Sequence, residues 1–349
     1  MGSDKQFRRI LVTGGAGFIG ANFVRHVADR HPEVEITVLD ALTYAGNIHN
    51  LDGVRGQITF VEGDIRDAKA VDEAVAGQDA VVHFAAESHN DNAIFDPQPF
   101  ISTNIEGTFR LLQAVRKYDV RFHHISTDEV YGDMPLSSTA KFTEDSPYRP
   151  SSPYAASKAA SDQLVRAWVR TYGVKATISN CSNNYGPWQH VEKFIPRQIT
   201  NVLCGLPVQI YGDGRAVRDW IAVEDQCSAV WAVLERGRIG ETYIISAGGE
   251  CSNIEIARMI LQTMGRSGDH PDAGIEFVRD RPGADQRYAL DASRIRRQLG
   301  WEPQSTDFGQ GLAKTVEWYE EHRSWWEAVK GETEQHYADM ARCQDGGRQ

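Results

Sequence analysis

The chain has 349 residues, a length that suits a large nucleotide-binding domain with a smaller second lobe. Its 41% hydrophobic and 24% charged residues are typical of a globular protein, and no apolar run is long enough to span a bilayer, so we expect no membrane association. A formal net charge of −11 excludes broad nucleic-acid binding, so an anionic ligand would have to meet locally gathered Arg and Lys side chains.

The first half of the chain alternates between predicted strands and predicted helices. This alternation predicts an α/β protein whose residues 1–187 form a Rossmann-type, doubly wound parallel sheet that binds NAD. Hydrophobic periodicity predicts strands at 8–13, 35–40, 58–62, 79–84, 122–126 and 175–179, and helices at 18–29, 68–76, 99–118 and 153–172.

The spacing of the elements becomes less regular in the second half. Short strands mixed with helices predict a smaller C-terminal α/β lobe for substrate binding, which takes up most of residues 188–330. We expect the chain to return to the first sheet near 217–235, with a strand at 220–223. Residues 331–349 are predicted to form a polar, loosely held tail. The short strands predicted in the lobe span 208–211, 241–245 and 275–278.

The five cysteines bear on the cellular compartment. Their number is odd and no two form a Cys-x-x-Cys pair, so they indicate neither a disulfide framework nor a zinc site. We therefore predict a cytoplasmic protein with no metal site. The cysteines are Cys181, Cys204, Cys227, Cys251 and Cys343.

Polar residues and glycines follow each of the six predicted strands of the first half. Ligands of such sheets bind beyond the carboxyl ends of the strands, so these residues should gather at one rim. They are Gly14, Asp40, Asp64, the segments 85–88 and 127–129, and the pair Asn183 and Asn184.

The glycine motif predicts a dinucleotide site. Gly14, Gly17 and Gly20 follow a strand and open a helix, where glycines let the backbone approach a pyrophosphate at the helix N-terminus. Asp40 follows at the expected interval of roughly 20 residues and would bond the adenosine ribose hydroxyls. Its carboxylate would repel a 2′-phosphate, which favours NAD over NADP. The alternative is a tight strand–helix turn without a ligand.

A second motif joins Tyr154 and Lys158. Residues four apart share a helix face, so the ammonium should lie beside the phenol. We expect the ammonium and a nearby nicotinamide cation to lower the phenol pKa from about 10 and make Tyr154 a base for a sugar hydroxyl. The alternative is an ordinary surface Tyr–Lys pair.

The glycine motif and Tyr154-x-x-x-Lys158 together resemble the extended short-chain dehydrogenase/reductase family, which acts on nucleotide sugars. Further motifs over residues 8–325 are similar to those of the dTDP-glucose 4,6-dehydratases within it. The acid pair in 126–132 is the most diagnostic, since relatives that only epimerise or decarboxylate generally lack it. The motifs are AAESH at 85–89, STDEVYG at 126–132, NCSNNYGP at 180–187, EK at 192–193, RDW at 218–220 and DRPG at 280–283.

This resemblance implies a redox-neutral lyase that converts dTDP-glucose to dTDP-4-keto-6-deoxyglucose. Tyr154, with Thr127 at the C4 oxygen, takes the C4 hydroxyl proton while a hydride moves to NAD. Glu129 then removes the C5 proton, Asp128 protonates the leaving C6 hydroxyl, and the hydride returns to C6 as a proton returns to C5. Asp128 can act as an acid near neutral pH only if burial or a neighbouring carboxylate raises its pKa.

The resemblance also implies the remaining site residues and a homodimer formed by helices 99–118 and 153–172. The expected catalytic residues are Thr127, Asp128, Glu129, Tyr154 and Lys158. The expected NAD contacts are Gly14, Gly17, Phe18, Ile19, Gly20, Asp40, Thr43, Asp64, Ile65, Ala85, Ala86, Thr103, Tyr154, Lys158 and Asn184. The expected substrate contacts are Ser88, Thr127, Asn183, Lys193, Arg218, Asn253, Arg281 and Tyr288.

Three positions depart from the family pattern. Asn90, Asn92 and Ala284 stand where many relatives have Val, Arg and His. We expect them to leave the chemistry intact and to bear on base specificity, because thymine and uracil differ by one methyl group, worth only about 1–3 kcal/mol in a pocket.

Two alternative functions stay open at this stage. One is a UDP-sugar epimerase or decarboxylase of the same family, and the other is a catalytically silent NAD-binding protein. The product could feed dTDP-rhamnose biosynthesis or a secondary-metabolite deoxysugar.

Overall fold

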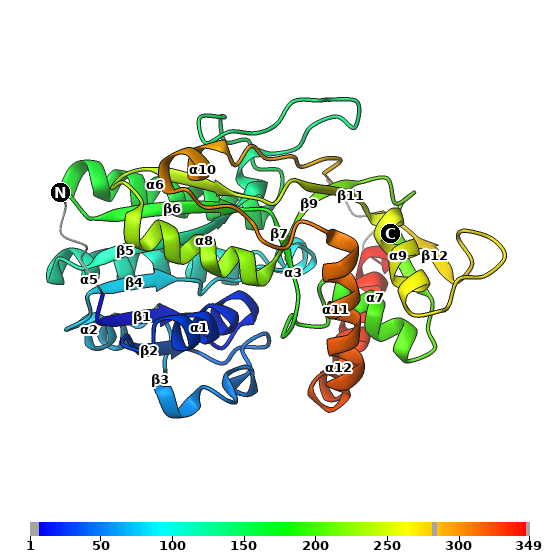
Figure 1. Ribbon diagram of the computed structural model, residues 1–349, viewed down its shortest axis with the longest axis horizontal. Helices are drawn as coiled ribbons and strands as arrows, with labels where there is room; N and C mark the ends of the chain where they lie inside the picture. Colours follow the sequence, from blue (N-terminus) through cyan, green and yellow to red (C-terminus); the bar gives the residue numbers. More distant parts are fainter. Residues whose placement is uncertain (1–6, 281–284, 347–349) are drawn as a thin grey trace.

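The computed structural model describes residues 7–280 and 285–346 (Figure 1). A seven-stranded sheet forms the larger part of the molecule, and a three-stranded and a two-stranded sheet belong to the smaller part. None of the described helices is long and apolar enough to cross a membrane. Among the described residues, no group of three or more His, Cys, Asp or Glu side chains could hold a metal ion.

The large sheet is parallel throughout, with the strand order β10-β6-β5-β4-β1-β2-β3. The order reverses between β1 and β4, and such a switch point leaves a crevice beyond the carboxyl ends of the strands. The predicted Rossmann-type, doubly wound sheet is therefore confirmed. Its strands are β1 (Arg9–Thr13), β2 (Glu35–Asp40), β3 (Ile58–Glu62), β4 (Ala80–His83), β5 (Arg121–Thr127), β6 (Ala176–Cys181) and β10 (Thr242–Ile245).

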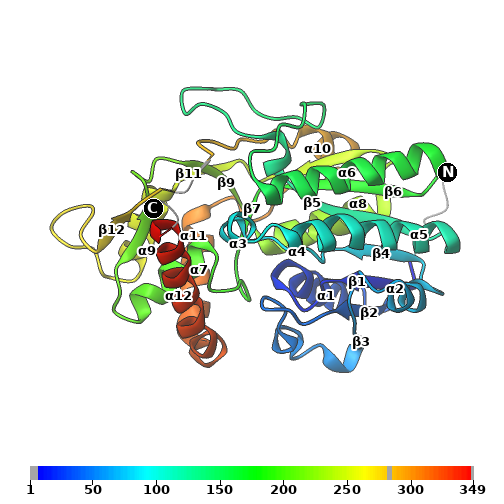
Figure 2. The ribbon, with the colours of Figure 1, turned by 180° about the vertical axis from the view of Figure 1, so that it is seen from behind.

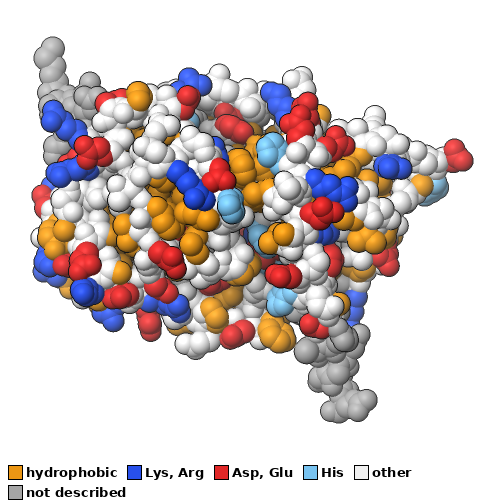
Figure 3. All heavy atoms as spheres, turned by 90° about the horizontal axis from the view of Figure 1, so that it is seen from below, with side chains coloured by type: hydrophobic (Ala, Val, Ile, Leu, Met, Phe, Trp, Pro, Cys, Tyr) orange, Lys and Arg blue, Asp and Glu red, His pale blue; other side chains and the backbone are white. Residues whose placement is uncertain are grey.

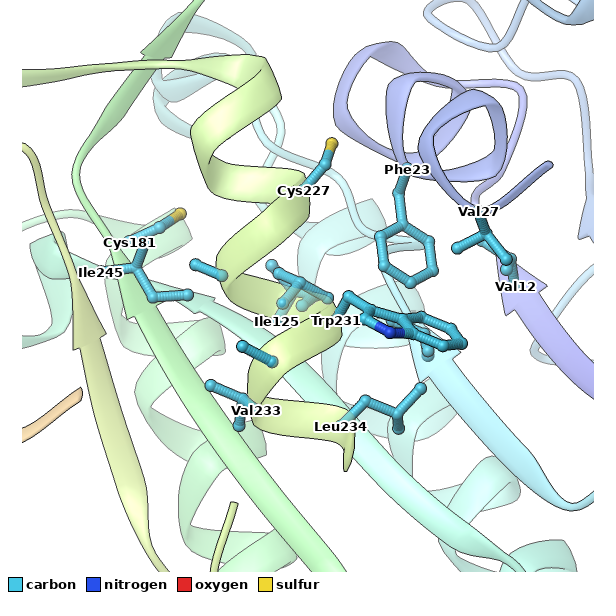
Figure 4. Close-up of a cluster of buried hydrophobic side chains, with 14 of the residues drawn as sticks. Val12, Phe23, Val27, Ile125, Cys181, Cys227, Trp231, Val233, Leu234 and Ile245 are labelled. Carbon is cyan, nitrogen blue, oxygen red and sulfur yellow. The ribbon is translucent and has the colours of Figure 1, made fainter. Parts of the chain in front are cut away.

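Helices cover both faces of this sheet (Figures 1 and 2). On one face α1 packs against α8, and the rings of Phe23 and Trp231 lie 6.4 Å apart in the buried cluster of Figure 4. On the other face a second apolar cluster joins α2, α5 and α6 to the sheet. A sheet buried on both faces explains the continuous apolar runs in its strands. The helices are α1 (Phe18–Arg30), α2 (Ala68–Val75), α5 (Thr108–Tyr118), α6 (Pro153–Tyr172), α8 (Val223–Arg236) and α10 (Ser293–Leu299).

The predicted helix at 99–118 consists of three consecutive segments. Its middle segment, η3 (Ile101–Gly107), is a π-helix that lies between α4 (Gln98–Phe100) and α5. π turns occur often at functional sites. The shorter elements of the large part also include η1 (Ile48–Leu51), η2 (Arg55–Gln57), α3 (Asn90–Phe95) and η4 (Asp128–Tyr131).

The smaller part has its own apolar core between helices and short strands. One sheet has the order β11-β9-β7, and the other pairs β12 with β8. The strands are β7 (Asn183–Tyr185), β8 (Val208–Tyr211), β9 (Val217–Ala222), β11 (Gly249–Ser252) and β12 (Ile275–Val278), and the helices are α7 (Phe194–Leu203), α9 (Asn253–Thr263), α11 (Phe308–Glu321) and α12 (Arg323–Gly346).

Two predicted strands belong to the other sheet. The strand expected at 220–223 to rejoin the large sheet lies in β9 of the three-stranded sheet, and the strand expected at 241–245 in the lobe is β10 at the edge of the large sheet. Both are short and apolar, so the hydrophobic pattern could not reveal the partner strand. The return of the chain to the large sheet is made by α8 and β10.

The prediction of a loose polar tail after residue 330 is wrong, because α12 continues as a helix to Gly346. Lys330 and Glu334 form an ion pair on α12, and Glu334 also binds the Arg197 guanidinium of α7 at 2.7 Å. The Arg197 guanidinium lies 3.7 Å from the centroid of the Tyr337 ring. These charged side chains join α12 to α7, so the polar composition of the segment does not indicate a loose tail.

Candidate active site

A cavity of about 540 Å³ lies at the carboxyl ends of the large sheet and extends to the smaller part. On the face shown in Figure 3, acidic and basic side chains are interspersed. The cavity brings together most of the predicted site residues. Those that line it are Gly14, Gly17, Phe18, Ile19, Gly20, Asp40, Thr43, Asp64, Ile65, Ala85, Ala86, Ser88, Thr103, Thr127, Asp128, Glu129, Tyr154, Lys158, Asn183, Asn184 and Lys193.

The turn between β1 and α1 requires its glycines. Gly14 has a φ of 71°, and a Cβ there would lie 2.5 Å from the Ala85 nitrogen. A Cβ at Gly20 would collide with the Gly14 carbonyl oxygen. Gly17 caps α1 without a side chain, so the first amides of the helix face the cavity without a capping group. Uncapped amides at a helix N-terminus suit a pyrophosphate.

Asp40 is held rigidly at the end of β2. Its two carboxylate oxygens accept hydrogen bonds from the backbone amides of Ala16 and Leu42, each at 2.9 Å. Burial raises the pKa of Asp40, and the two amide bonds oppose that rise. The carboxylate has lone pairs left for ribose hydroxyls. Together with the uncapped α1 amides, this arrangement fits NAD.

Arg66 lines the same cavity and was not foreseen from the sequence. Its guanidinium donates to both carboxylate oxygens of Asp64, with a closest distance of 2.6 Å. The hydrogen bonds from Arg66 lower the pKa of Asp64. The predicted NAD contact at Asp64 is thus part of an ion pair. Asp64 and Arg66 are two positions apart in the sequence, and hydrophobic periodicity gives no sign of an ion pair between them.

Helix α6 presents Tyr154 and Lys158 to the cavity. Ser152 caps the helix by accepting from the Ala155 amide, Pro153 occupies its first turn, and Gly173 ends it with a φ of 70°. Both functional side chains are at most 9% exposed. The Lys158 ammonium donates to the Ile125 carbonyl oxygen at 2.7 Å, and burial lowers the pKa of Lys158 to about 8.

The expectation that the Tyr154 pKa is lowered is wrong for this arrangement. Burial raises the pKa of Tyr154 well above 10, and the negative charge of Glu129 raises it further. A hydrogen bond with Thr127 acts in the opposite direction. Sequence spacing placed Lys158 on the right face but could not reveal that the phenol is buried beside a carboxylate.

The acid pair follows directly from the end of β5. Thr127 Oγ1 donates to Asp128 Oδ1 at 3.2 Å and accepts from the Glu129 amide at 3.3 Å, so one hydroxyl holds both residues in the η4 turn. Asp128 is 2% exposed. Burial raises its pKa well above the usual value, and the charges of Glu129 and Asp219 add to the rise. A raised pKa is what a proton donor near neutral pH requires, so the direction of this shift agrees with that role.

A buried polar network supports this rim from below. Asp162, one turn beyond Lys158 on α6, accepts from Ser126 Oγ at 3.0 Å and from Tyr148 Oη at 2.7 Å. Asn180 Nδ2 donates both to Asp162 and to the Thr127 carbonyl oxygen. The end of β5 is thus fixed to α6, which orients the two sets of catalytic side chains relative to each other.

The predicted substrate residues divide into two groups. Ser88, Asn183 and Lys193 line the cavity, and the Lys193 ammonium donates to the Ser88 carbonyl oxygen at 2.9 Å. Among the described residues, the buried Oδ1 atoms of Asn183 and Asn184 have no hydrogen-bond partner. Both amides therefore retain acceptors that a ligand could use.

Arg218, Asn253 and Tyr288 do not line this cavity. The Arg218 guanidinium lies 4.4 Å from the centroid of the Tyr288 ring and donates to the Asp285 carbonyl oxygen at 2.9 Å. Arg218 still influences the pKa of Asp128, so it lies near the acid pair. Arg281 and Ala284 lie outside the described residues.

Two further residues at the site escaped the sequence reasoning. Asn104, in the π-helix, accepts from the Glu87 amide at 2.9 Å and donates to Ser157 Oγ at 2.8 Å, which ties the loop after β4 to α6. Glu192 is 7% exposed and accepts from Tyr44 Oη at 3.2 Å. Glu192 was singled out only as part of a motif, and no local pattern marks Asn104.

Comparison with known proteins decides the family. Residues 11–315 match the family described as GDP-mannose 4,6 dehydratase. The chain is 58% identical over 331 residues to a dTDP-glucose 4,6-dehydratase of Mycobacterium tuberculosis, an alignment that covers 95% of this chain and 99% of the relative. This chain belongs to the dTDP-glucose 4,6-dehydratase family.

Solved structures agree with this assignment. The dTDP-glucose 4,6-dehydratase DesIV of Streptomyces venezuelae, with NAD and dTDP bound, is 48% identical with a TM-score of 0.88, over 92% of this chain and 99% of that one. A UDP-glucose 4-epimerase of Thermus thermophilus in complex with NAD is 30% identical with a TM-score of 0.82, over 90% and 99% of the two chains. The dTDP-glucose 4,6-dehydratase family thus shares its fold with epimerases, and the site must distinguish the two reactions.

Proposed function

We propose that this chain is an NAD-dependent lyase that dehydrates dTDP-glucose to dTDP-4-keto-6-deoxyglucose. One observation carries the proposal: Thr127 joins the Asp128–Glu129 pair to Tyr154 inside a cavity that fits a dinucleotide. Elimination of water needs a base for the C5 proton and an acid for the C6 hydroxyl, and the adjacent carboxylates can supply both. The relatives named above support the substrate and the cofactor.

The uncapped start of α1, Asp40 and the Asn184 amide would hold NAD. When bound, NAD supplies an acceptor for the C4 hydrogen and gives the same hydrogen back to C6. Tyr154 would take the proton of the C4 hydroxyl, while Thr127 orients that oxygen. Because burial and Glu129 oppose ionisation of Tyr154, the positive charge of Lys158 has to favour the phenolate as the proton moves.

The elimination step would use the acid pair. Once C4 is a ketone, the C5 proton is acidic, and Glu129 would remove it as the C5–C6 double bond forms. Burial beside Glu129 raises the pKa of Asp128 and so favours its protonated form, which would give its proton to the C6 hydroxyl that leaves as water. Return of hydrogen to C6 and of a proton to C5 leaves the substrate lighter by one water with no net oxidation.

The test is incubation with dTDP-glucose and UDP-glucose in separate reactions, followed by mass spectrometry. We expect loss of one water from dTDP-glucose and a much slower reaction of UDP-glucose. A product of unchanged mass that chromatography separates from the substrate would identify an epimerase, and absence of any turnover would identify a catalytically silent NAD-binding protein.

We also propose a cytoplasmic homodimer that makes a precursor for deoxysugars such as rhamnose. Ile101 of η3 and Tyr172 of α6 are 44% and 45% exposed, which supports an interface on the helices predicted for it. The described cysteines are all free, which supports a reducing compartment. Sedimentation velocity of the purified protein would test the dimer, with a monomer as the contradicting result.

A further inference from the structure

Asn90 occupies a position where many relatives have Val, and its side chain contacts the acid pair. It is the first residue of α3, just beyond the loop that follows β4. Its Nδ2 atom donates to Glu129 Oε2 at 2.9 Å. A valine could make no such bond, so this contact belongs to the chain's own sequence and not to the general pattern of its relatives.

The neighbouring Ser152 determines which way the Asn90 amide faces. Ser152 Oγ accepts from the Ala155 amide at 3.1 Å and donates its own proton to Asn90 Oδ1 at 2.9 Å. A hydroxyl has one proton and an amide oxygen only accepts, so Nδ2 must turn toward Glu129. The hydrogen bonds therefore run in one direction, from the first turn of α6 through Ser152 and Asn90 to Glu129.

This chain of bonds links two catalytic groups through one helix. Ser152 is the N-cap of α6, and Tyr154 lies two residues further along the same helix. Glu129 lies in the short η4 turn, where a Glu side chain has several rotamers to choose from. A donor that holds one carboxylate oxygen restricts those rotamers and so fixes the direction in which the carboxylate points.

We propose that Asn90 is a positioning residue that holds Glu129 for removal of the C5 proton, with its own orientation set by Ser152. The proposal rests on the proposed dehydration. Helix α6 then positions both Tyr154, directly, and the base Glu129, through Ser152 and Asn90. A hydrogen bond to a charged group contributes about 1.5–3 kcal/mol, so its loss should slow the elimination step by roughly tenfold or more.

The test replaces Asn90 by the residue that many relatives carry, Asn90→Val. We expect turnover to fall roughly tenfold while KM for dTDP-glucose changes less than about twofold. With substrate deuterated at C5 the kinetic isotope effect should rise, and with substrate deuterated at C4 it should fall, because C5–H cleavage becomes more rate-limiting. The control is Ile94→Val on the same helix, a change at an exposed side chain, which should leave both isotope effects unchanged.

Variants of Ser152 test the orienting bond separately. Ser152→Ala should raise the C5 isotope effect in the same direction as Asn90→Val, and Ser152→Thr, which keeps the hydroxyl, should restore it. Thermal unfolding of each variant shows whether loss of the N-cap accounts for the change. A merely structural role would lower the melting temperature or raise KM and leave the C5 isotope effect as it was.

The measurements distinguish a failure of the proposed function from a failure of the role proposed for Asn90. If the unaltered chain forms no 4-keto-6-deoxy product, the proposed function is wrong and this proposal falls with it. If the unaltered chain dehydrates dTDP-glucose and the C5 isotope effect of Asn90→Val equals that of the unaltered chain, only the role of Asn90 is overturned.

Discussion

The larger and smaller parts of the molecule place their functional side chains by different means. In the larger part, Gly14, Asp40 and Thr127 each lie at or just after the carboxyl end of a parallel strand, so the sheet itself brings them to one rim. In the smaller part, Arg218 and Tyr288 come from segments 70 positions apart and meet through side-chain contact. Substitutions in the first region should therefore act on the chemical step, and those in the second on binding and stability.

The sharpest test of the first region is Glu129→Gln. A general base contributes roughly 10²–10⁴-fold to a rate, so exchange of the C5 proton with solvent should fall by about that factor. Oxidation at C4 should persist, because Tyr154 and Lys158 are untouched. Deuterium incorporation at C5 and the C4 isotope effect measure the two steps. Equal loss of both would show that the acid pair and Tyr154 act as one unit, and the exposed Glu73→Gln serves as the control.

In the second region, Asp219→Asn should change the pH dependence of stability. Burial raises the pKa of Asp219 to about 6, so the folded state holds a proton that the unfolded chain releases near pH 4. The free energy of unfolding of the native chain should then fall by up to about 3 kcal/mol as the pH rises from 4 to 6. Asp219→Asn removes this titration. The free energy of unfolding of the variant, relative to that of the native chain, should therefore increase as the pH rises from 4 to 6.

Urea unfolding at several pH values measures the effect of Asp219→Asn. Asp213→Asn is the matched control, since Asp213 lies on the surface and its pKa is lowered by hydrogen bonds from Arg215. A constant difference between Asp219→Asn and the native chain at all pH values would contradict the assignment.

Arg218→Met should separate binding from chemistry. If the guanidinium meets the substrate diphosphate, its loss removes charge-assisted hydrogen bonds worth about 1.5–3 kcal/mol, so KM should rise roughly tenfold or more. The value of kcat should change little, in contrast to Glu129→Gln. Arg215→Met, which breaks only an exposed ion pair, is the control. A fall in kcat at constant KM would place Arg218 with the catalytic residues and weaken the contrast between the two parts.

The smallest expected effect is that of Tyr337→Phe. The Tyr337 hydroxyl lies 2.9 Å both from His89 Nε2 in the larger part and from the Glu192 carbonyl oxygen beside the cavity. Its loss should cost about 1 kcal/mol of stability and raise KM a few-fold without changing the C5 isotope effect. Thermal unfolding measures the change in stability, and steady-state kinetics measure the change in KM. No change in either quantity would mean that α12 does not help to close the site.

The sequence was most informative where local pattern and position in the sheet agree. Gly14, Gly20 and Asp40 combine a strand, a turn and a helix start, and the structure brings them to the cavity as expected. The seven parallel strands were almost all foreseen, because a sheet covered on both faces leaves continuous apolar runs. The roles of the individual site residues stay predictions until the variants are measured.

What the sequence could not convey depends on contacts between distant segments. Asn104 owes its place to a π turn, and Tyr337 to a helix whose charged residues find partners on α7. The direction of the Tyr154 pKa shift depends on burial beside Glu129, which spacing does not record. The strands β9 and β10 were assigned to each other's sheets because short apolar runs carry no information on their partners.

Helix α12 also sets an order for the assembly of the protein. Every motif that defines the family lies before residue 284, yet Tyr337 contacts both parts of the molecule only after the last helix is made. During synthesis from the N-terminus, the larger part could fold and hold a dinucleotide while the wall beside Glu192 is still incomplete. Termination of synthesis before Tyr337 would thus release a chain with intact motifs and an unfinished site.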